Sequence, residues 1–157
     1  FASLFGETVG SQSYAFLMSV NAVTVLVATA FLTIWTHKIG QLNSMALAML
    51  FYVLGYTVYA GCTSFVPFLV ATCIWTLGEI LMATNANVFV NAYTPPSLRS
   101  RANAYLMTTS SLGHALSPSY GGLLLLVLDY RQLWLINAGL CFLLGCGYIA
   151  LNKHLKR

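Results

Sequence analysis

Five long apolar stretches divide the chain, and short polar segments separate them. The stretches cover residues 14–35, 44–60, 66–90, 102–128 and 133–151. An α-helix rises about 1.5 Å per residue and the hydrocarbon core of a bilayer is about 30 Å thick, so stretches of this length predict transmembrane helices. Strands of a membrane barrel would instead alternate apolar and polar residues over about ten positions. We therefore expect an all-α membrane protein with about five transmembrane helices.

The segments between the stretches contain residues that end helices. A polar loop at 36–43 and a turn at 61–64 follow the first two stretches, and two adjacent prolines interrupt residues 93–101. Proline lacks a backbone N–H and breaks helical hydrogen bonding. Pro118 lies inside the fourth stretch, where it predicts a bend.

The composition indicates that lipid, and not water, surrounds most of the chain. Hydrophobic types make up 59% of the 157 residues and charged types only 6%, whereas an average soluble domain is about 25% charged. So few charges cannot cover a water-facing surface, and the lipid bilayer is the expected partner. The net charge of +4 comes without a basic stripe interleaved with aromatics, so a nucleic-acid partner is not expected.

The positive charges also predict an orientation. With five helices, one side of the membrane receives six of the seven Lys and Arg residues, and the other receives Arg131. The six are Lys38, Arg99, Arg101, Lys153, Lys156 and Arg157. Because Lys and Arg concentrate on the cytoplasmic side, we expect a multi-pass cell-membrane protein with its N-terminus outside and its C-terminus in the cytoplasm.

The beginning of the sequence predicts no signal peptide, because residues 1–13 contain no basic segment ahead of an apolar core. The first residue is Phe1. Together with the odd number of helices, this leads us to expect a segment of a longer protein.

Neither an enzyme nor a metal or other cofactor is expected. The sequence contains no metal-binding histidine pair, no phosphate-binding glycine loop and no nucleophile elbow. Cys62, Cys73, Cys141 and Cys146 show no ligand spacing with histidines, and we expect them to be small buried apolar residues.

Glu79 is an acid near the middle of residues 66–90. A charge at the bilayer centre costs about 2.5–3.5 kcal/mol on insertion scales, and intramembrane acids are usually functional. Burial favours the neutral carboxyl, and a carboxyl that exchanges a proton near neutral pH is what a proton-coupled carrier needs. The alternative is a protonated side chain that only holds helices together.

Helical spacing places a polar stripe around Glu79. The stripe contains Thr72, Thr76, Glu79, Ala83 and Asn87. Trp75 lies at its edge, where it could stack on an aromatic or cationic ligand or only pack. We expect Thr72, Trp75 and Thr76 to line a substrate cavity.

Four further residues of the apolar stretches are candidates. His114 lies mid-stretch with Ser110 and Ser117 on nearly the same face. Imidazole titrates near neutral pH, so His114 could relay protons or pair with Glu79. The alternative is a neutral histidine bonded to a serine or a backbone carbonyl. Asn21 and the two serines could line the cavity or only join helices by hydrogen bonds.

Several segments carry a resemblance to a known family. The first is WTLGEIL at 75–81, and the second combines Pro96, residues 98–101, Tyr105, residues 111–113, Pro118 and residues 121–122. They are similar to the tenth helix, and to the following loop and eleventh helix, in the C-terminal half of Major Facilitator Superfamily transporters, nearest the multidrug drug:proton antiporters. Asn21 fits a recurring asparagine of the eighth helix. The chain departs from the family at 37–40, where an acid is missing, at Ser100, which replaces a common glycine, and at His114, which replaces a frequent arginine.

The resemblance implies that residues 1–157 form helices eight to twelve of a major-facilitator six-helix bundle. The seventh helix and the N-terminal half of the same carrier would be its partners. In such carriers two bundles rock about a cavity near the midplane. The first, third and fourth stretches would border that cavity, and the second and fifth would face lipid. Glu79 would couple protons to the export of a small lipophilic, often cationic, compound.

Two other functions stay open. A facilitator for another solute class, such as a sugar or a lipid, is compatible with Asn85, Asn87 and Asn91 toward the end of the third stretch. A non-transporting membrane subunit would use Glu79 only to pin its helices.

Overall fold

The computed structural model describes residues 7–36 and 38–155, with side chains from Gln12 onward. These residues form α2 (Glu7–Thr36), α3 (Gln41–Gly61), α4 (Phe65–Tyr93), the 3-10 helix η1 (Pro96–Leu98), α5 (Arg99–Leu124) and α6 (Tyr130–Leu155), and they contain no strand. The predicted all-α fold is confirmed. Four residues on which the expectations for the chain start, the 37–40 loop and the orientation rest lie outside the described residues: Phe1, His37, Lys156 and Arg157.

Four helices have the length and composition needed to cross a membrane: α2 over Gln12–Thr36, α3, α4 and α6. The fifth, α5, is as long as α6, with 26 residues each, but many of its positions are Ser, Thr or Gly, and it is less apolar than the other four. A membrane-spanning helix of this kind needs protein or water beside its polar positions. Five long helices therefore form as predicted, but in the described part of the chain only four of them are apolar enough to be identified as membrane spans by their own composition.

The end of α5 differs from the prediction. Pro118 lies inside the helix without ending it, whereas residues 125–128, expected to be helical, form a turn. The Leu125 N–H bonds the Gly121 carbonyl at 3.1 Å and the Leu128 N–H bonds the Leu124 carbonyl at 2.8 Å. These residues must reverse the chain before α6 begins at Tyr130, which is why the helix stops early.

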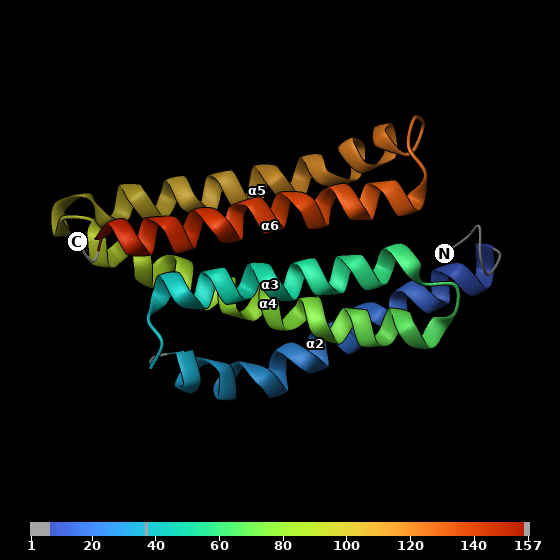
Figure 1. Ribbon diagram of the computed structural model, residues 1–157, viewed down its shortest axis with the longest axis horizontal. Coiled ribbons are helices and arrows are strands. Elements are labelled where there is room, and N and C mark those ends of the chain that lie inside the picture. Colours follow the sequence, from blue (N-terminus) through green and yellow to red (C-terminus); the bar gives the residue numbers. More distant parts are fainter. Residues whose placement is uncertain (1–6, 37, 156–157) are drawn as a thin grey trace.

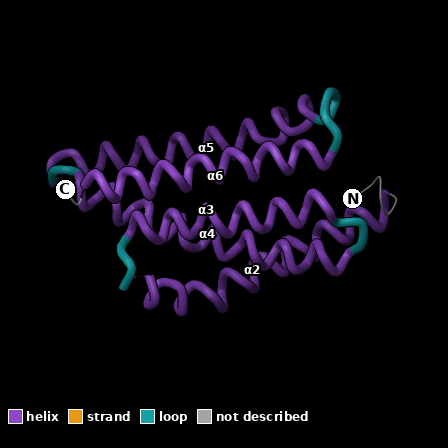
Figure 2. The backbone as a smooth tube through the Cα atoms, in the orientation of Figure 1, coloured by secondary structure: helices purple, strands orange, loops and turns teal. Residues whose placement is uncertain are grey.

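The helices lie roughly along one common direction (Figures 1 and 2). α3 packs extensively against both α4 and α6, and α2 packs against α4. α5 packs mainly against α4, and none of its residues is buried. The most enclosed side chains include Phe68 and Leu81 of α4 and Ala48 of α3. α3 and α4 therefore form the centre of the bundle.

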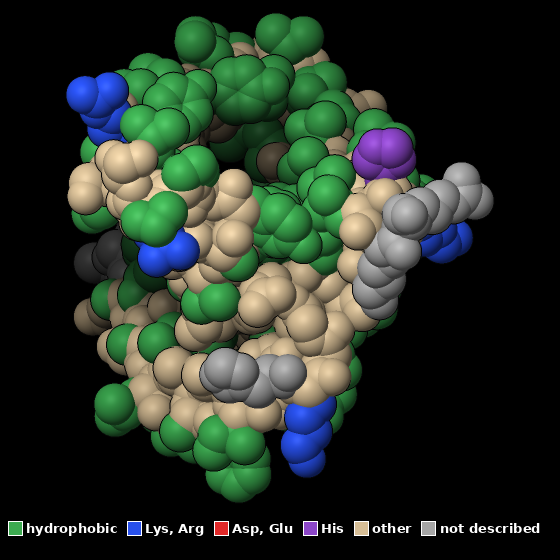
Figure 3. Space-filling view, turned by 90° about the vertical axis from the view of Figure 1, so that its left-hand side faces the viewer, with side chains coloured by type: hydrophobic (Ala, Val, Ile, Leu, Met, Phe, Trp, Pro, Cys, Tyr) green, Lys and Arg blue, Asp and Glu red, His purple; other side chains and the backbone are tan. Residues whose placement is uncertain are grey.

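One end of the bundle collects positive charge. α2, α4 and α6 end there and α3 and α5 begin there (Figure 1). Lys38, Arg99, Arg101 and Lys153 all lie in these terminal segments. Figure 3 looks onto this end and shows Lys, Arg and His side chains but no acidic one on the visible face. We call it the basic end.

Glycines bring the central helices close together. A Cβ on Gly78 would lie 2.7 Å from the Ala48 carbonyl oxygen, and a Cβ on Gly55 would lie 2.7 Å from the Trp75 Cβ. A Cβ on Gly145 would lie 3.1 Å from the Met49 Cβ. Lipid tails are as apolar as the helices, so association in a bilayer depends on close packing of this kind.

The cysteine prediction was only partly right. All four cysteines are free; Cys62 is buried, Cys73 and Cys141 are half-buried, and Cys146 is exposed. α6 packs mainly against α3, through a face that includes the buried Gly145, and most of its other positions are not buried. An apolar stretch in a membrane protein therefore does not indicate burial within the protein.

Candidate functional site

The candidate site centres on a hydrogen-bonded link between α2 and α4. The Asn21 amide nitrogen donates to the Glu79 Oε2 at 3.0 Å and to the Thr76 Oγ1 at 2.8 Å. The Thr76 hydroxyl in turn donates to the Thr72 carbonyl at 2.7 Å. The structure thus joins Asn21, which the sequence singled out on its own, to Thr76 and Glu79 of the polar stripe.

The direction of this link is fixed by the amide. An amide nitrogen can only donate, so the Glu79 oxygen accepts. Among the described residues, no Lys, Arg or His forms an ion pair with Glu79. The carboxyl is half-buried, and the phenols of Tyr52 and Tyr56 on α3 lie within its electrostatic reach. Glu79 is therefore held in place by a neutral partner and has no fixed counter-charge.

A second network joins α3 to α4. The Trp75 indole N–H donates to the Tyr59 hydroxyl oxygen at 3.0 Å, and the hydroxyls of Tyr59 and Thr72 are 2.7 Å apart. Because the Thr72 proton bonds the Phe68 carbonyl at 2.8 Å, Tyr59 is the donor to Thr72. Thr72 and Thr76 are both 0% exposed, so their hydroxyls hold helices in place in this conformation.

Trp75 lines a cavity of about 390 Å³ in the half of the bundle away from the basic end. We call it the aromatic cavity, and four helices contribute to it. Its lining residues are Tyr14, Leu17, Met18, Tyr56, Tyr59, Trp75, Tyr130 and Trp134. The ring centroids of Trp134 lie 4.8 Å from Tyr59 and 5.2 Å from Tyr56. Aromatic faces attract cations and stack on flat rings.

Tyr130 and Trp134 of this cavity were not predicted from the sequence as site residues. Both lie in the first two turns of α6, four residues apart, with ring centroids 6.0 Å from each other. A pair of aromatics at helical spacing was the available signal. Only the packing of α6 on α3 places this pair opposite Tyr56 and Tyr59.

The rest of the polar stripe faces α5. Asn87 and Ala83 are exposed and line a second cavity of about 540 Å³ together with Ser110, Thr109 and other residues of α5. α5 is joined to the end of α4 by the Asn103 amide, which donates to the Asn91 oxygen at 2.8 Å. Its walls are mostly apolar and include Met82, Leu106 and Met107. We call it the α4–α5 cavity, and it is separate from the aromatic one.

The structure does not bring His114 to Glu79. No hydrogen bond or ion pair connects the two side chains in the described part of the chain. His114 is exposed on α5, and its carbonyl accepts a bond from the Ser117 hydroxyl at 3.1 Å. Ser117 and Ser110 are exposed as well. Within residues 7–36 and 38–155, no group of three His, Cys, Asp or Glu side chains could hold a metal ion.

A bundle of long apolar helices around an intramembrane acid is typical of membrane carriers. The sequence model of the Major Facilitator Superfamily matches residues 1–156. The chain therefore belongs to this superfamily of secondary transporters, which are not enzymes. No curated protein and no solved structure shows a significant match.

Removing the amide of Asn21 tests the link directly. We expect Asn21→Leu to lower transport by up to about tenfold, because Glu79 loses the donor that positions its carboxyl, a hydrogen bond worth about 0.5–1.5 kcal/mol. Initial transport rates in vesicles provide the measurement. Ser19→Ala on the same helix is the control, since the Ser19 hydroxyl only bonds the Ala15 carbonyl of its own turn. Equal rates for Asn21→Leu and the wild type would contradict the proposed link.

Proposed function

We propose that this chain is the proton-handling part of a secondary transporter that exchanges protons for small lipophilic or cationic compounds and exports them. The observation that supports this most is Glu79, a half-buried carboxyl in the middle of α4 that is bonded to Asn21 and has no cationic partner among the described residues. A carboxylate without a fixed counter-charge can bind either a proton or a cationic substrate. Competition between the two at one group couples their movements in opposite directions.

The aromatic cavity supports the class of cargo. Trp75 lines it from α4, one helical turn from Glu79 in the sequence. Tyr56 also lines it and lies in the electrostatic field of Glu79. Aromatic walls next to a carboxylate favour a flat, lipophilic cation over a neutral polar solute.

The arrangement in the membrane follows from the same proposal. We assign the basic end to the cytoplasm of a cell membrane, which puts the aromatic cavity toward the outer side. The helices would correspond to helices eight to twelve of the carrier, and a partner bundle from its N-terminal half would complete the cavity. Glu79 would then be the proton-coupling residue, and His114 on α5 a second candidate.

The polar groups of the α4–α5 cavity favour a second candidate function. Asn87, Thr109 and Ser110 supply amide and hydroxyl groups to it, and groups of this kind bind sugars and other neutral polar solutes. A facilitator of such a solute would use this cavity and would not need a proton at Glu79.

Transport by reconstituted vesicles separates the two functions. Vesicles with an acidic interior should accumulate a lipophilic aromatic cation such as ethidium, and a protonophore should abolish the accumulation. Trp134→Leu should raise KM for the cation by at least about tenfold, since a desolvated cation–π contact is worth about 2 kcal/mol or more. Trp35→Leu is the matched control, because Trp35 is 49% exposed and lies outside the aromatic cavity. Accumulation of a neutral sugar, independent of pH and of Trp134, would support the facilitator instead.

A further inference from the structure

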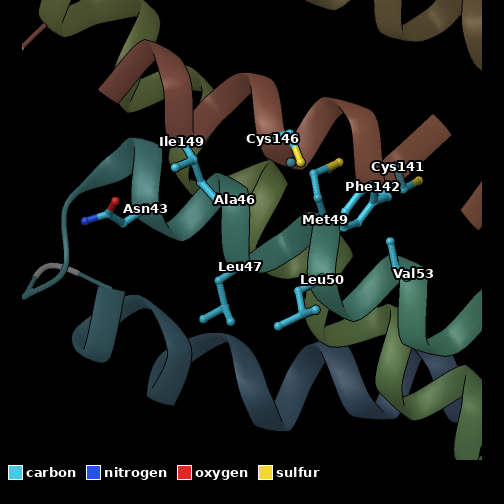
Figure 4. A pocket seen from close by; sticks show the side chains of 11 residues that line it. Asn43, Ala46, Leu47, Met49, Leu50, Val53, Cys141, Phe142, Cys146 and Ile149 are labelled. Atoms are coloured by element: carbon cyan, nitrogen blue, oxygen red, sulfur yellow. The ribbon is translucent and has the colours of Figure 1, made fainter. Parts of the chain in front are cut away.

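We propose that the seam between α3 and α6 is a binding site for one anionic membrane phospholipid. The seam contains a groove of about 360 Å³ with almost entirely apolar walls (Figure 4). Its main lining residues are Ala46, Leu47 and Leu50 of α3 and Phe142, Cys146 and Ile149 of α6. We call it the α3–α6 groove.

The groove has the direction and length of part of an acyl chain. Its α3 residues extend from Asn43 to Val53, and its α6 residues from Ile149 back to Cys141. Ten residues of helix correspond to about 15 Å. Because the groove follows the helix axes, a lipid chain that runs across its own leaflet can lie in it along its length.

Small residues let α3 and α6 approach closely beneath the groove. Gly145 lies against the Met49 Cβ, where an added Cβ would come within 3.1 Å. Ala46 faces α6 from the other side of the seam (Figure 4). Leu50 and Phe142, which also line the groove, are 51% and 60% exposed. The groove therefore lies over a closely packed seam, and its exposed apolar walls fit a chain of methylene groups.

The groove ends in polar groups at the basic end. Asn43 lines it there, and the Asn152 amide of α6 donates to the Asn43 oxygen at 2.6 Å. The Asn43 amide nitrogen donates to the Ile39 carbonyl at 2.8 Å. Each amide therefore keeps a second N–H without a partner among the described residues. These donors lie where a lipid phosphate would be if its acyl chain occupied the groove.

Charge selects among lipids. Lys153 continues the stripe of α6 that lines the groove, since positions 142, 146, 149 and 153 share one helical face. It is exposed in the last turn of α6. The acids of the chain are Glu7, Glu79 and Asp129, and none belongs to the terminal segments that form the basic end. A basic surface of this kind attracts anionic head groups.

Lipid competition tests the site. The protein, purified in detergent, is given equal amounts of phosphatidylglycerol and phosphatidylcholine, and native mass spectrometry counts the lipid retained. We expect phosphatidylglycerol to be retained about fivefold more than phosphatidylcholine, and Lys153→Gln to remove that preference, since one basic residue near a membrane surface contributes about this factor. Arg131→Gln, at the other end of the bundle, should leave the preference unchanged.

Filling the groove tests the position of the chain. Cys146→Phe should reduce retention of both lipids, whereas Ala30→Phe, at an exposed position of α2, should not. Cys146 is exposed, so the larger ring leaves the core of the bundle intact. Equal retention of the two lipids by the wild type, or unchanged retention by Cys146→Phe, would overturn the site. Transport plays no part in either readout, so the result is independent of the proposed function.

Discussion

Glu79→Gln should reduce pH-driven transport to the level of vesicles that lack the protein. The amide has the size of the acid and its oxygen can still accept the bond from the Asn21 nitrogen, which is 3.0 Å long in the wild type. What the variant loses is the ability to bind and release a proton. We therefore expect normal folding and normal thermal stability together with absent coupling, measured as cation accumulation in vesicles with an acidic interior.

Two further variants sharpen this experiment. Glu79→Asp keeps a carboxyl but withdraws it by one methylene from Asn21, so it should retain part of the activity. Asp129→Asn is the matched control, because Asp129 is an exposed acid in the turn before α6. If Glu79→Gln accumulates the cation as the wild type does, Glu79 is a structural residue and the proton-coupling proposal fails.

Gly78→Ala should destabilise the bundle by about 1–3 kcal/mol, the usual cost of overpacking. The added methyl would meet the Ala48 carbonyl oxygen at 2.7 Å and the Phe51 Cβ at 3.2 Å. A backbone carbonyl cannot rotate away as the end of a side chain can, so α3 and α4 must separate. Thermal unfolding in detergent, followed by size-exclusion chromatography, measures the loss.

The control variant, Gly147→Ala, should not lower the stability of the bundle. Gly147 lies inside α6 with nothing within 4 Å of an added Cβ. Alanine favours a helix over glycine by about 1 kcal/mol, so Gly147→Ala should be neutral or stabilising. Gly55→Ala, whose methyl would meet the Trp75 Cβ at 2.7 Å, should resemble Gly78→Ala and is not adjacent to Glu79. Equal unfolding temperatures for all three variants would mean that close glycine packing does not hold the helices together.

The helices could be predicted from the sequence because length and hydropathy determine which segments cross a bilayer. The neighbours of each helix could not. In water, an apolar stripe shows which face of a helix packs. In a membrane, lipid-facing and protein-facing positions are both apolar, so Leu26 of α2 and Leu81 of α4 look alike in the sequence although they are 81% and 0% exposed.

Polar residues were the better guide to the site. Asn21 and Glu79 were singled out because each is costly in lipid, and the same cost explains why they bond each other. The pairing of His114 with Glu79 that the sequence left open is absent from the described structure, since α5 packs mainly on α4 and buries no residue. Trp134 could not be identified from the sequence as a site residue, because its position in the aromatic cavity depends on which helix α6 packs against.

The sparse attachment of α5 has a consequence for how the protein is made. A translocon inserts segments largely by their hydrophobicity, and α5 is the least apolar of the five helices. A short turn connects it to α6, which is apolar enough to enter on its own. Retention of α5 in the bilayer during synthesis then depends on contact with α4, which is made before it, and on the prompt arrival of α6 behind it. Slowing elongation just after Leu124 would affect the topology of this helix more than that of any other.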